Sequence, residues 1–148
     1  MTPQETRSDA GLAAVLRISV SRLARRLRAE RLVRGLPELS DTQLAALAAL
    51  ERHGSMSPGE LAEHEKVQPP SMTRVIAVLQ ERELVMRAPH ATDRRQVKLT
   101  VTDHGRLVVQ QTRKLREAWL AQRLRELTAQ ERATLRAAAP ILEKLSQS

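Results

Sequence analysis

Four polar side chains at the start of one short amphipathic segment carry the donors and acceptors that DNA bases and phosphates recognise. They surround a Pro69-Pro70 pair and are Gln68, Ser71, Thr73 and Arg74. Arg can bind guanine through two hydrogen bonds, Gln can pair with adenine, and hydroxyls can reach bases or phosphates. The alternative is that Gln68 and Ser71 cap a helix and that Arg74 faces solvent. Both interpretations can hold together, because a helix N-terminus itself attracts phosphate.

A second polar group, Asp93-Arg94-Arg95, lies in a Pro-broken stretch from residue 88 to 95, between two short apolar segments. The guanidinium group suits contacts with phosphates and with the minor groove. The alternative is a solvated charged turn, which would suit any hairpin tip. Arg87 and Lys98 on the flanking segments are weaker candidates for DNA contact.

Two helices and a hairpin are expected to position these side chains. Ser57-Pro58-Gly59-Glu60 has a cap, a first-turn proline and the spacing of a capping box, so a helix begins there. Pro69-Pro70 begins a second helix, because proline is tolerated only in a first turn. This second helix has one apolar face, made by Met72, Val75, Ile76 and Leu79. Segments 84–87 and 96–101 are predicted strands. The order predicts a winged helix-turn-helix, which is a mainly α fold with a small β-hairpin wing.

With these features, the chain resembles the MarR family of bacterial transcription regulators. The resemblance is carried by Leu79-x4-Leu84-Val85-x-Arg87, by Asp93-Arg94-Arg95, and by Leu99-Thr100 with Thr102-x2-Gly105. It implies that the helix beginning at Pro69-Pro70 is the recognition helix and that its side chains contact bases. It also implies that Asp93 braces the wing, that Arg95 enters the minor groove and that Arg94 binds phosphate. The Pro69-Pro70 pair departs from the family pattern.

The segments around the motif predict amphipathic helices. Expected N-caps are Asp9, Ser40 with Gln43, Thr102 or Asp103, and Thr128 with Glu131. We expect one domain over 1–148, with a DNA-binding region at 40–102 and a helical dimerisation region at 9–34 and 103–147. The flanking helices have more apolar surface than a small winged domain needs, so we expect a homodimer. Its predicted interface is Leu12, Leu16, Leu120, Leu124, Leu135, Leu142 and Leu145. The alternative is that these helices pack on their own domain.

Composition narrows the partners. The 148 residues include 25 basic and 17 acidic ones, for a formal net charge of +8, which favours a polyanionic partner. Trp119 is the only aromatic residue besides histidine, which argues for duplex DNA over single-stranded nucleic acid. There is no cysteine and no apolar run of membrane-spanning length, so we expect a cytoplasmic protein without a membrane partner.

Enzyme and metal chemistry find little support. We see no nucleophile with a base, no Gly-rich phosphate loop and no HExxH-type site, and we expect no cofactor. Glu60 and His64 share one helix face, but a surface pair is a better interpretation than a metal site.

The leading functional prediction is a dimeric repressor on a pseudo-palindromic operator, released by a small molecule. The family resemblance implies a lipophilic or anionic aromatic effector. Trp119 is expected in the dimer core or in the wall of an effector cavity. The alternatives are a ligand-insensitive regulator or an architectural DNA-binding protein.

Overall fold

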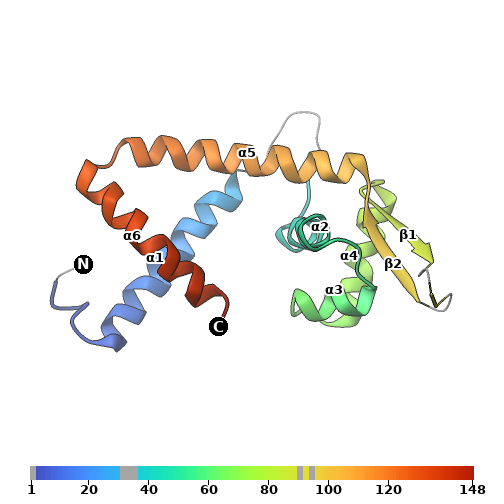
Figure 1. The fold of residues 1–148 in the computed structure, drawn as a ribbon, viewed down its shortest axis with the longest axis horizontal. Coiled ribbons are helices and arrows are strands. Elements are labelled where there is room, and N and C mark those ends of the chain that lie inside the picture. Colours follow the sequence, from blue (N-terminus) through green and yellow to red (C-terminus); the bar gives the residue numbers. More distant parts are fainter. Residues whose placement is uncertain (1–2, 31–36, 90–91, 94–95) are drawn as a thin grey trace. The chain divides into compact units, whose positions relative to one another are not determined.

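The computed structural model describes residues 3–30, 37–89, 92–93 and 96–148. Over these residues it contains six helices and one two-stranded antiparallel sheet (Figure 1). The helices are α1 (Asp9–Ala29), α2 (Asp41–His53), α3 (Pro58–His64), α4 (Pro69–Glu81), α5 (Asp103–Arg125) and α6 (Ala129–Ser146). The strands are β1 (Val85–Pro89) and β2 (Val97–Val101). The predicted fold class, mainly α with a β-hairpin wing, is confirmed.

The chain divides into two compact units. The winged unit spans 28–115, and the helical unit combines 1–27 with 116–148. Helix α5 contributes residues to both units. These bounds are wider for the winged part than the predicted 40–102, and the division into a DNA-binding and a dimerisation region stays a prediction.

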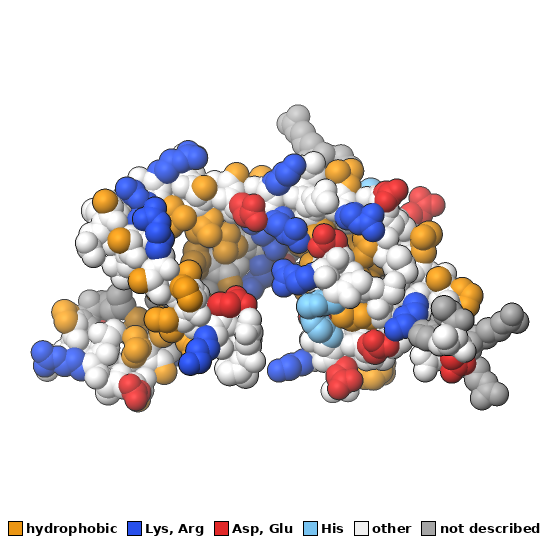
Figure 2. All heavy atoms as spheres, in the orientation of Figure 1, with side chains coloured by type: hydrophobic (Ala, Val, Ile, Leu, Met, Phe, Trp, Pro, Cys, Tyr) orange, Lys and Arg blue, Asp and Glu red, His pale blue; other side chains and the backbone are white. Residues whose placement is uncertain are grey.

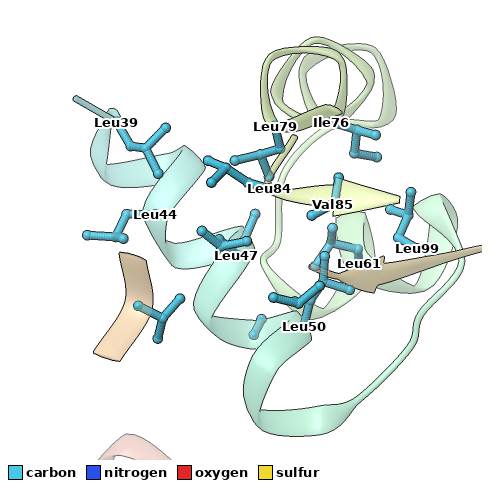
Figure 3. Close-up of a cluster of buried hydrophobic side chains, with 14 of the residues drawn as sticks. Leu39, Leu44, Leu47, Leu50, Leu61, Ile76, Leu79, Leu84, Val85 and Leu99 are labelled. Atoms are coloured by element: carbon cyan, nitrogen blue, oxygen red, sulfur yellow. The ribbon is translucent and has the colours of Figure 1, made fainter. Parts of the chain in front are cut away.

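The core of the winged unit is made of aliphatic side chains from α2, α3, α4, the hairpin and the first half of α5. Figure 3 shows these side chains converging between the helices and the strands. The largest fully buried ones are Leu47, Leu61, Met72, Ile76, Leu79, Leu84, Leu99 and Val108. Met72, Ile76 and Leu79 come from the predicted apolar face of α4, so the opposite face of that helix is left to solvent.

The helix ends of the winged unit are satisfied by the residues that the sequence pattern indicated. The capping box of α2 is complete, with Gln43 N–H donating to Ser40 Oγ at 3.2 Å and Ser40 N–H donating to Gln43 Oε1 at 3.0 Å. In α3, Ser57 Oγ accepts from Glu60 N–H at 3.1 Å, but the predicted capping box is only half formed, because the Glu60 carboxylate accepts from Lys98. Gly54 closes α2 with φ +80°, a left-handed value that favours glycine.

Strand β1 extends beyond its predicted end, and one residue outside the hairpin, which the sequence did not indicate, pairs with β2. Strand β1 continues through Ala88 and Pro89, which pair with Lys98 and Val97. Proline is tolerated here because a two-stranded sheet has only edge strands. Beyond the hairpin, Met56 pairs with Leu99 through two backbone hydrogen bonds of 2.7 and 3.3 Å.

Thr102 and Gly105 join the hairpin to α5. Thr102 Oγ1 donates to the Glu83 carbonyl at 2.7 Å and accepts from Gly105 N–H at 3.0 Å, so Thr102 is the cap of α5. A Cβ on Gly105 would lie 2.2 Å from the Leu84 carbonyl oxygen. The Thr-x2-Gly spacing therefore has a steric reason, since only glycine lets α5 begin this close to Leu84, the residue before β1.

In the helical unit, neither α1 nor α6 contains a buried residue. Ser8 caps α1 one residue before the predicted Asp9, accepting from Gly11 N–H at 3.1 Å. Helix α1 ends at Ala29, whereas we expected it to reach residue 34; residues 31–36 lie outside the described residues. The capping box between Thr128 and Glu131 is confirmed at the start of α6.

Candidate nucleic-acid interface

The start of α4 presents all four predicted side chains to solvent. Gln68 is the N-cap residue, but its side chain makes no capping hydrogen bond, so the capping interpretation of Gln68 is wrong. Ser71 and Arg74 are exposed. Thr73 is also exposed, and its hydroxyl donates to the Pro69 carbonyl at 3.0 Å, which leaves the hydroxyl oxygen as an acceptor. Gln68 at the N-cap and the other three residues in the first turns of α4 are therefore all accessible to solvent, and their contact with bases stays a prediction.

The two prolines change what the backbone of α4 can offer an anion. A helix normally presents several unpaired N–H groups in its first turn. Pro69 and Pro70 occupy the first two helical positions and have no N–H, while Met72 N–H already donates to the Gln68 carbonyl at 3.0 Å. Only the Ser71 N–H remains as a first-turn donor. Recognition at this helix must depend mainly on side chains.

The wing tip is described in part. Asp93 is exposed, and its backbone carbonyl accepts from Gln96 N–H at 3.1 Å. Arg94 and Arg95 lie outside the described residues. The roles implied for the three residues, bracing by Asp93 and DNA contact by Arg94 and Arg95, stay predictions.

The two weaker candidates on the strands have partners inside the winged unit. Arg87 Nε donates to Gln80 Oε1 at 2.9 Å, and Lys98 Nζ lies 3.2 Å from Glu60 Oε1. The hydrogen bond from Lys98, followed by one from Ser57 and by the lysine charge, lowers the pKa of Glu60 below its ordinary value. The carboxylate therefore stays ionised beside Lys98. Glu60 does not form the expected surface pair with His64, whose Nδ1 instead lies 4.0 Å from Glu65 Oε2.

The predicted interface leucines lie on α1, α5 and α6 and are incompletely covered. Leu12, Leu135, Leu142 and Leu145 are exposed, while Leu16, Leu120 and Leu124 are half-buried. A groove of about 680 Å³ in the helical unit is lined mainly by apolar residues of α1 and α6, among them Leu12, Leu16, Leu142 and Leu145. Figure 2 shows hydrophobic side chains gathered on these helices.

Trp119 is half-buried in the helical unit between two guanidinium groups. Arg26 of α1 lies 5.7 Å from the ring centroid, and Arg123 of α5 lies 5.4 Å from it. Cations over an indole face are attracted by the ring quadrupole. Within one protomer, the indole ring therefore lies near two cations, and a role in a dimer core or an effector cavity stays a prediction.

Among the described residues, no group of three or more His, Asp or Glu side chains is arranged to hold a metal ion. None of the helices, as far as the chain is described, is both long and apolar enough to cross a bilayer.

Comparison with known proteins places this geometry in a family. The MarR family model matches residues 39–97. An HTH-type transcriptional regulator of Mycobacterium bovis is 46% identical over 135 residues, covering 91% of this chain and 92% of the relative. The repressor MdtR of Bacillus subtilis is 34% identical over 110 residues, covering 74% of this chain and 69% of MdtR.

Solved structures agree with the sequence relatives. A Mycobacterium tuberculosis protein has a TM-score of 0.85 at 25% identity, with 96% of this chain and 97% of that chain covered. A mutant of Escherichia coli MarR has a TM-score of 0.75 at 24% identity, with 90% and 95% covered. The fold and the recognition helix define a winged helix-turn-helix transcription regulator. The chain belongs to the MarR family, as its motifs indicated, and is a DNA-binding regulator.

Sequence reasoning missed the side chains that anchor the wing. Gln80 was not singled out, and Glu60 was interpreted as a capping residue and a partner of His64. Ser55 was also missed, although its hydroxyl lies 3.1 Å from that of Thr100. Each of the three contacts joins residues from different secondary-structure elements or loops. The periodicity within a single element therefore gave no signal for them. The alternation of Lys98 and Thr100 on one face of β2 was the available clue.

Proposed function

We propose that the protein is a homodimeric repressor that occupies a pseudo-palindromic operator and is released by a small-molecule effector. One observation carries the DNA-binding part of this proposal. Gln68, Ser71, Thr73 and Arg74 stand exposed on α4, while the opposite face of that helix is fixed in the core. A rigid helix with a free polar N-terminal face suits insertion into the major groove.

Dimerisation is supported by the apolar faces of α1 and α6. A second copy of the chain is the occupant that we propose for the groove lined by Leu12, Leu16, Leu142 and Leu145. Each leucine contributes roughly 1.5–3 kcal/mol when it is fully buried. A two-fold axis through these helices would present two recognition helices to one face of the duplex.

Repression and its release are the finer parts of the proposal. MdtR and the Pseudomonas putida relative NicR are both named as transcriptional repressors. We infer a lipophilic or anionic aromatic effector that changes the distance between the two winged units, so that both no longer fit the operator together. The alternative, a ligand-insensitive or architectural DNA-binding protein, would bind the same operator without responding to any compound in an effector screen.

The decisive experiment uses operator spacing. Duplexes selected from a random pool should contain half-sites centred about 10–10.5 base pairs apart, so that both recognition helices reach one face of the DNA. Insertion of five base pairs between the half-sites turns one of them to the opposite face. Affinity should then fall towards that for random duplex. The matched control inserts ten base pairs, which lengthens the site but restores the face. Retained affinity after the five-base-pair insertion would contradict binding by a fixed two-fold dimer.

A further inference from the structure

Each strand of the wing carries one cationic side chain, and each is bonded to a helix of the helix-turn-helix. Lys98 on β2 lies 3.2 Å from the Glu60 carboxylate of α3. Arg87 on β1 donates to the Gln80 side-chain carbonyl of α4 at 2.9 Å. The two helices that flank the turn are therefore both linked to the hairpin that follows them.

The register places the two links on opposite faces of the hairpin. Arg87 pairs with Leu99, and Lys98 pairs with Ala88. Residues directly opposite each other on antiparallel strands share a face, and successive residues alternate. Arg87 therefore shares the face of Leu99, whereas Lys98 shares the face of Thr100. The two side chains therefore leave the hairpin on opposite faces, Arg87 to reach α4 and Lys98 to reach α3.

Two more contacts hold the edge of β2. The Met56–Leu99 backbone pair adds a one-residue third strand beside β2. Next to it, the Ser55 and Thr100 hydroxyls lie 3.1 Å apart. Ser57, one residue after Met56, caps α3, so the segment that pairs with the wing is also the start of the helix that carries Glu60.

We propose that Glu60 and Gln80 are positioning residues, which fix the wing relative to the recognition helix through Lys98 and Arg87. On this view, Lys98 and Arg87 do not bind phosphate directly. The inference rests on the proposed DNA-binding function and adds to it the residues that set the position of the two strands of the hairpin relative to α4. It also revises the weaker prediction that both cations contact DNA.

The burial and charge of the Lys98 pair favour this assignment. The Lys98 side chain is only 24% exposed, and its charge is matched by an ionised carboxylate. A phosphate would have to displace that carboxylate to reach the ammonium group. If Lys98 bound phosphate instead, Glu60 would oppose DNA binding, and its removal would raise affinity.

A charge exchange separates the two possibilities. The variants are Lys98→Glu, Glu60→Lys, and the double variant that carries both. Affinity for the selected operator and its dependence on salt are measured for each, with circular dichroism as the check of folding. Arg106→Glu is the matched control, because it reverses one charge of an exposed pair with Asp103 in the same unit.

The positioning role predicts loss and rescue. Each single variant should weaken operator binding by at least about fivefold, since like charges replace an ion pair. The double variant should recover to within about twofold of the wild type, with an unchanged salt slope. A double variant as weak as Lys98→Glu, with a log–log salt slope about one unit smaller per protomer, would instead assign Lys98 to phosphate and overturn the inference.

Gln80→Leu tests the second link without a change of charge. It removes the acceptor of Arg87 and should weaken operator binding about threefold, at the low end of the net contribution of a typical hydrogen bond. Unchanged or higher affinity would overturn the role of Gln80, because a released Arg87 would then be free for phosphate. If the wild-type protein binds no duplex, both the proposed function and this inference are wrong. If the wild-type protein binds the operator but the double variant does not recover affinity, only this inference is wrong.

Discussion

In the winged unit, Leu47, Leu61 and Leu79 are completely shielded from solvent. In the helical unit, Leu23, Leu135 and Leu142 expose 45%, 44% and 42% of their surfaces. The residue type and the helical periodicity are the same in both units. The difference is that helices α2 to α4 are covered by the hairpin and by one another, whereas the apolar faces of α1 and α6 stay partly exposed among the residues that the structure describes.

The comparison separates what amphipathic periodicity can indicate from what it cannot. A three- and four-residue spacing of leucines identifies the face that leaves water, but not the surface that covers it. Contacts within the protomer cover that face in α4. The exposed faces of α1 and α6 are too extensive for scattered surface leucines, and contiguous apolar surface of this kind marks an interaction site. The winged unit is therefore expected to hold most of the stability of the isolated protomer.

Leucine truncations in the two units should have the largest and most different effects. Leu61→Ala leaves a cavity in the winged core and should lower the free energy of unfolding by about 2–5 kcal/mol. Leu142→Ala should change it by less than about 0.5 kcal/mol in dilute, monomeric protein, as expected for a surface site. Urea unfolding measures both variants.

The same pair tests the proposed interface. Leu142→Ala should weaken self-association in sedimentation or light scattering at rising protein concentration, and Leu61→Ala should not do so while it remains folded. Equal destabilisation of the dilute protein by both variants would mean that α6 is covered within the protomer and that the contrast between the units is wrong.

Two glycines, one in each unit, allow a further comparison, because a Cβ added to either would approach a backbone carbonyl oxygen. A Cβ on Gly105 would lie 2.2 Å from the Leu84 oxygen, and one on Gly11 would lie 1.8 Å from the Glu5 oxygen. Leu84 is buried and its carbonyl already accepts from Thr102 N–H, so it cannot move away. Glu5 lies in an exposed turn before α1 that can shift.

Gly105→Ala should therefore cost about 1–3 kcal/mol of unfolding free energy, the range for overpacking a fixed site. Gly11→Ala should cost less, because the shift is local and alanine favours a helix over glycine by about 0.5–1 kcal/mol. Thermal unfolding of the two variants shows which substitution lowers the stability more. A larger loss for Gly11→Ala would show that the segment before α1 is held as firmly as the core.

The sequence predicted the elements more fully than their connections. The apolar face of α4 and the capping boxes at Ser40 and Thr128 were evident, because each is a local pattern with one physical solution. The cap of α1 was misplaced by one residue because Ser8 and Asp9 are both good caps. Helix α1 was predicted to run past Ala29 because no residue type in the sequence from 30 to 34 forbids a helix; residues 31–34 lie outside the described residues.

The candidate site was predicted in its exposed parts only. Gln68, Ser71, Thr73 and Arg74 could be identified because polar residues opposite an apolar helix face must point to solvent. The links from Glu60 to Lys98 and from Gln80 to Arg87 could not, because they depend on how the hairpin folds back on α3 and α4. The spacing of residues along the sequence does not indicate which of these side chains come close together in the fold.

The smallest predicted effect concerns the pH dependence of the Glu60–Lys98 pair. The pKa of Glu60 is lowered in the folded protein, chiefly by the hydrogen bond from Lys98. A group with a lowered folded pKa stabilises the fold fully above its unfolded pKa, which is about 4.3 for glutamate, and loses this contribution as the pH falls through the folded value. The difference in unfolding midpoint between the wild type and Glu60→Gln should therefore be constant from pH 8 to about pH 5 and should shrink at lower pH. Glu126→Gln, which removes the same charge from a pair with Arg123 in the helical unit, corrects for the general effect of losing one negative charge. A difference that grows as the pH falls would mean that Glu60 is more easily ionised in the unfolded chain, and the wing would then lack the electrostatic link that sets it apart from the helical unit.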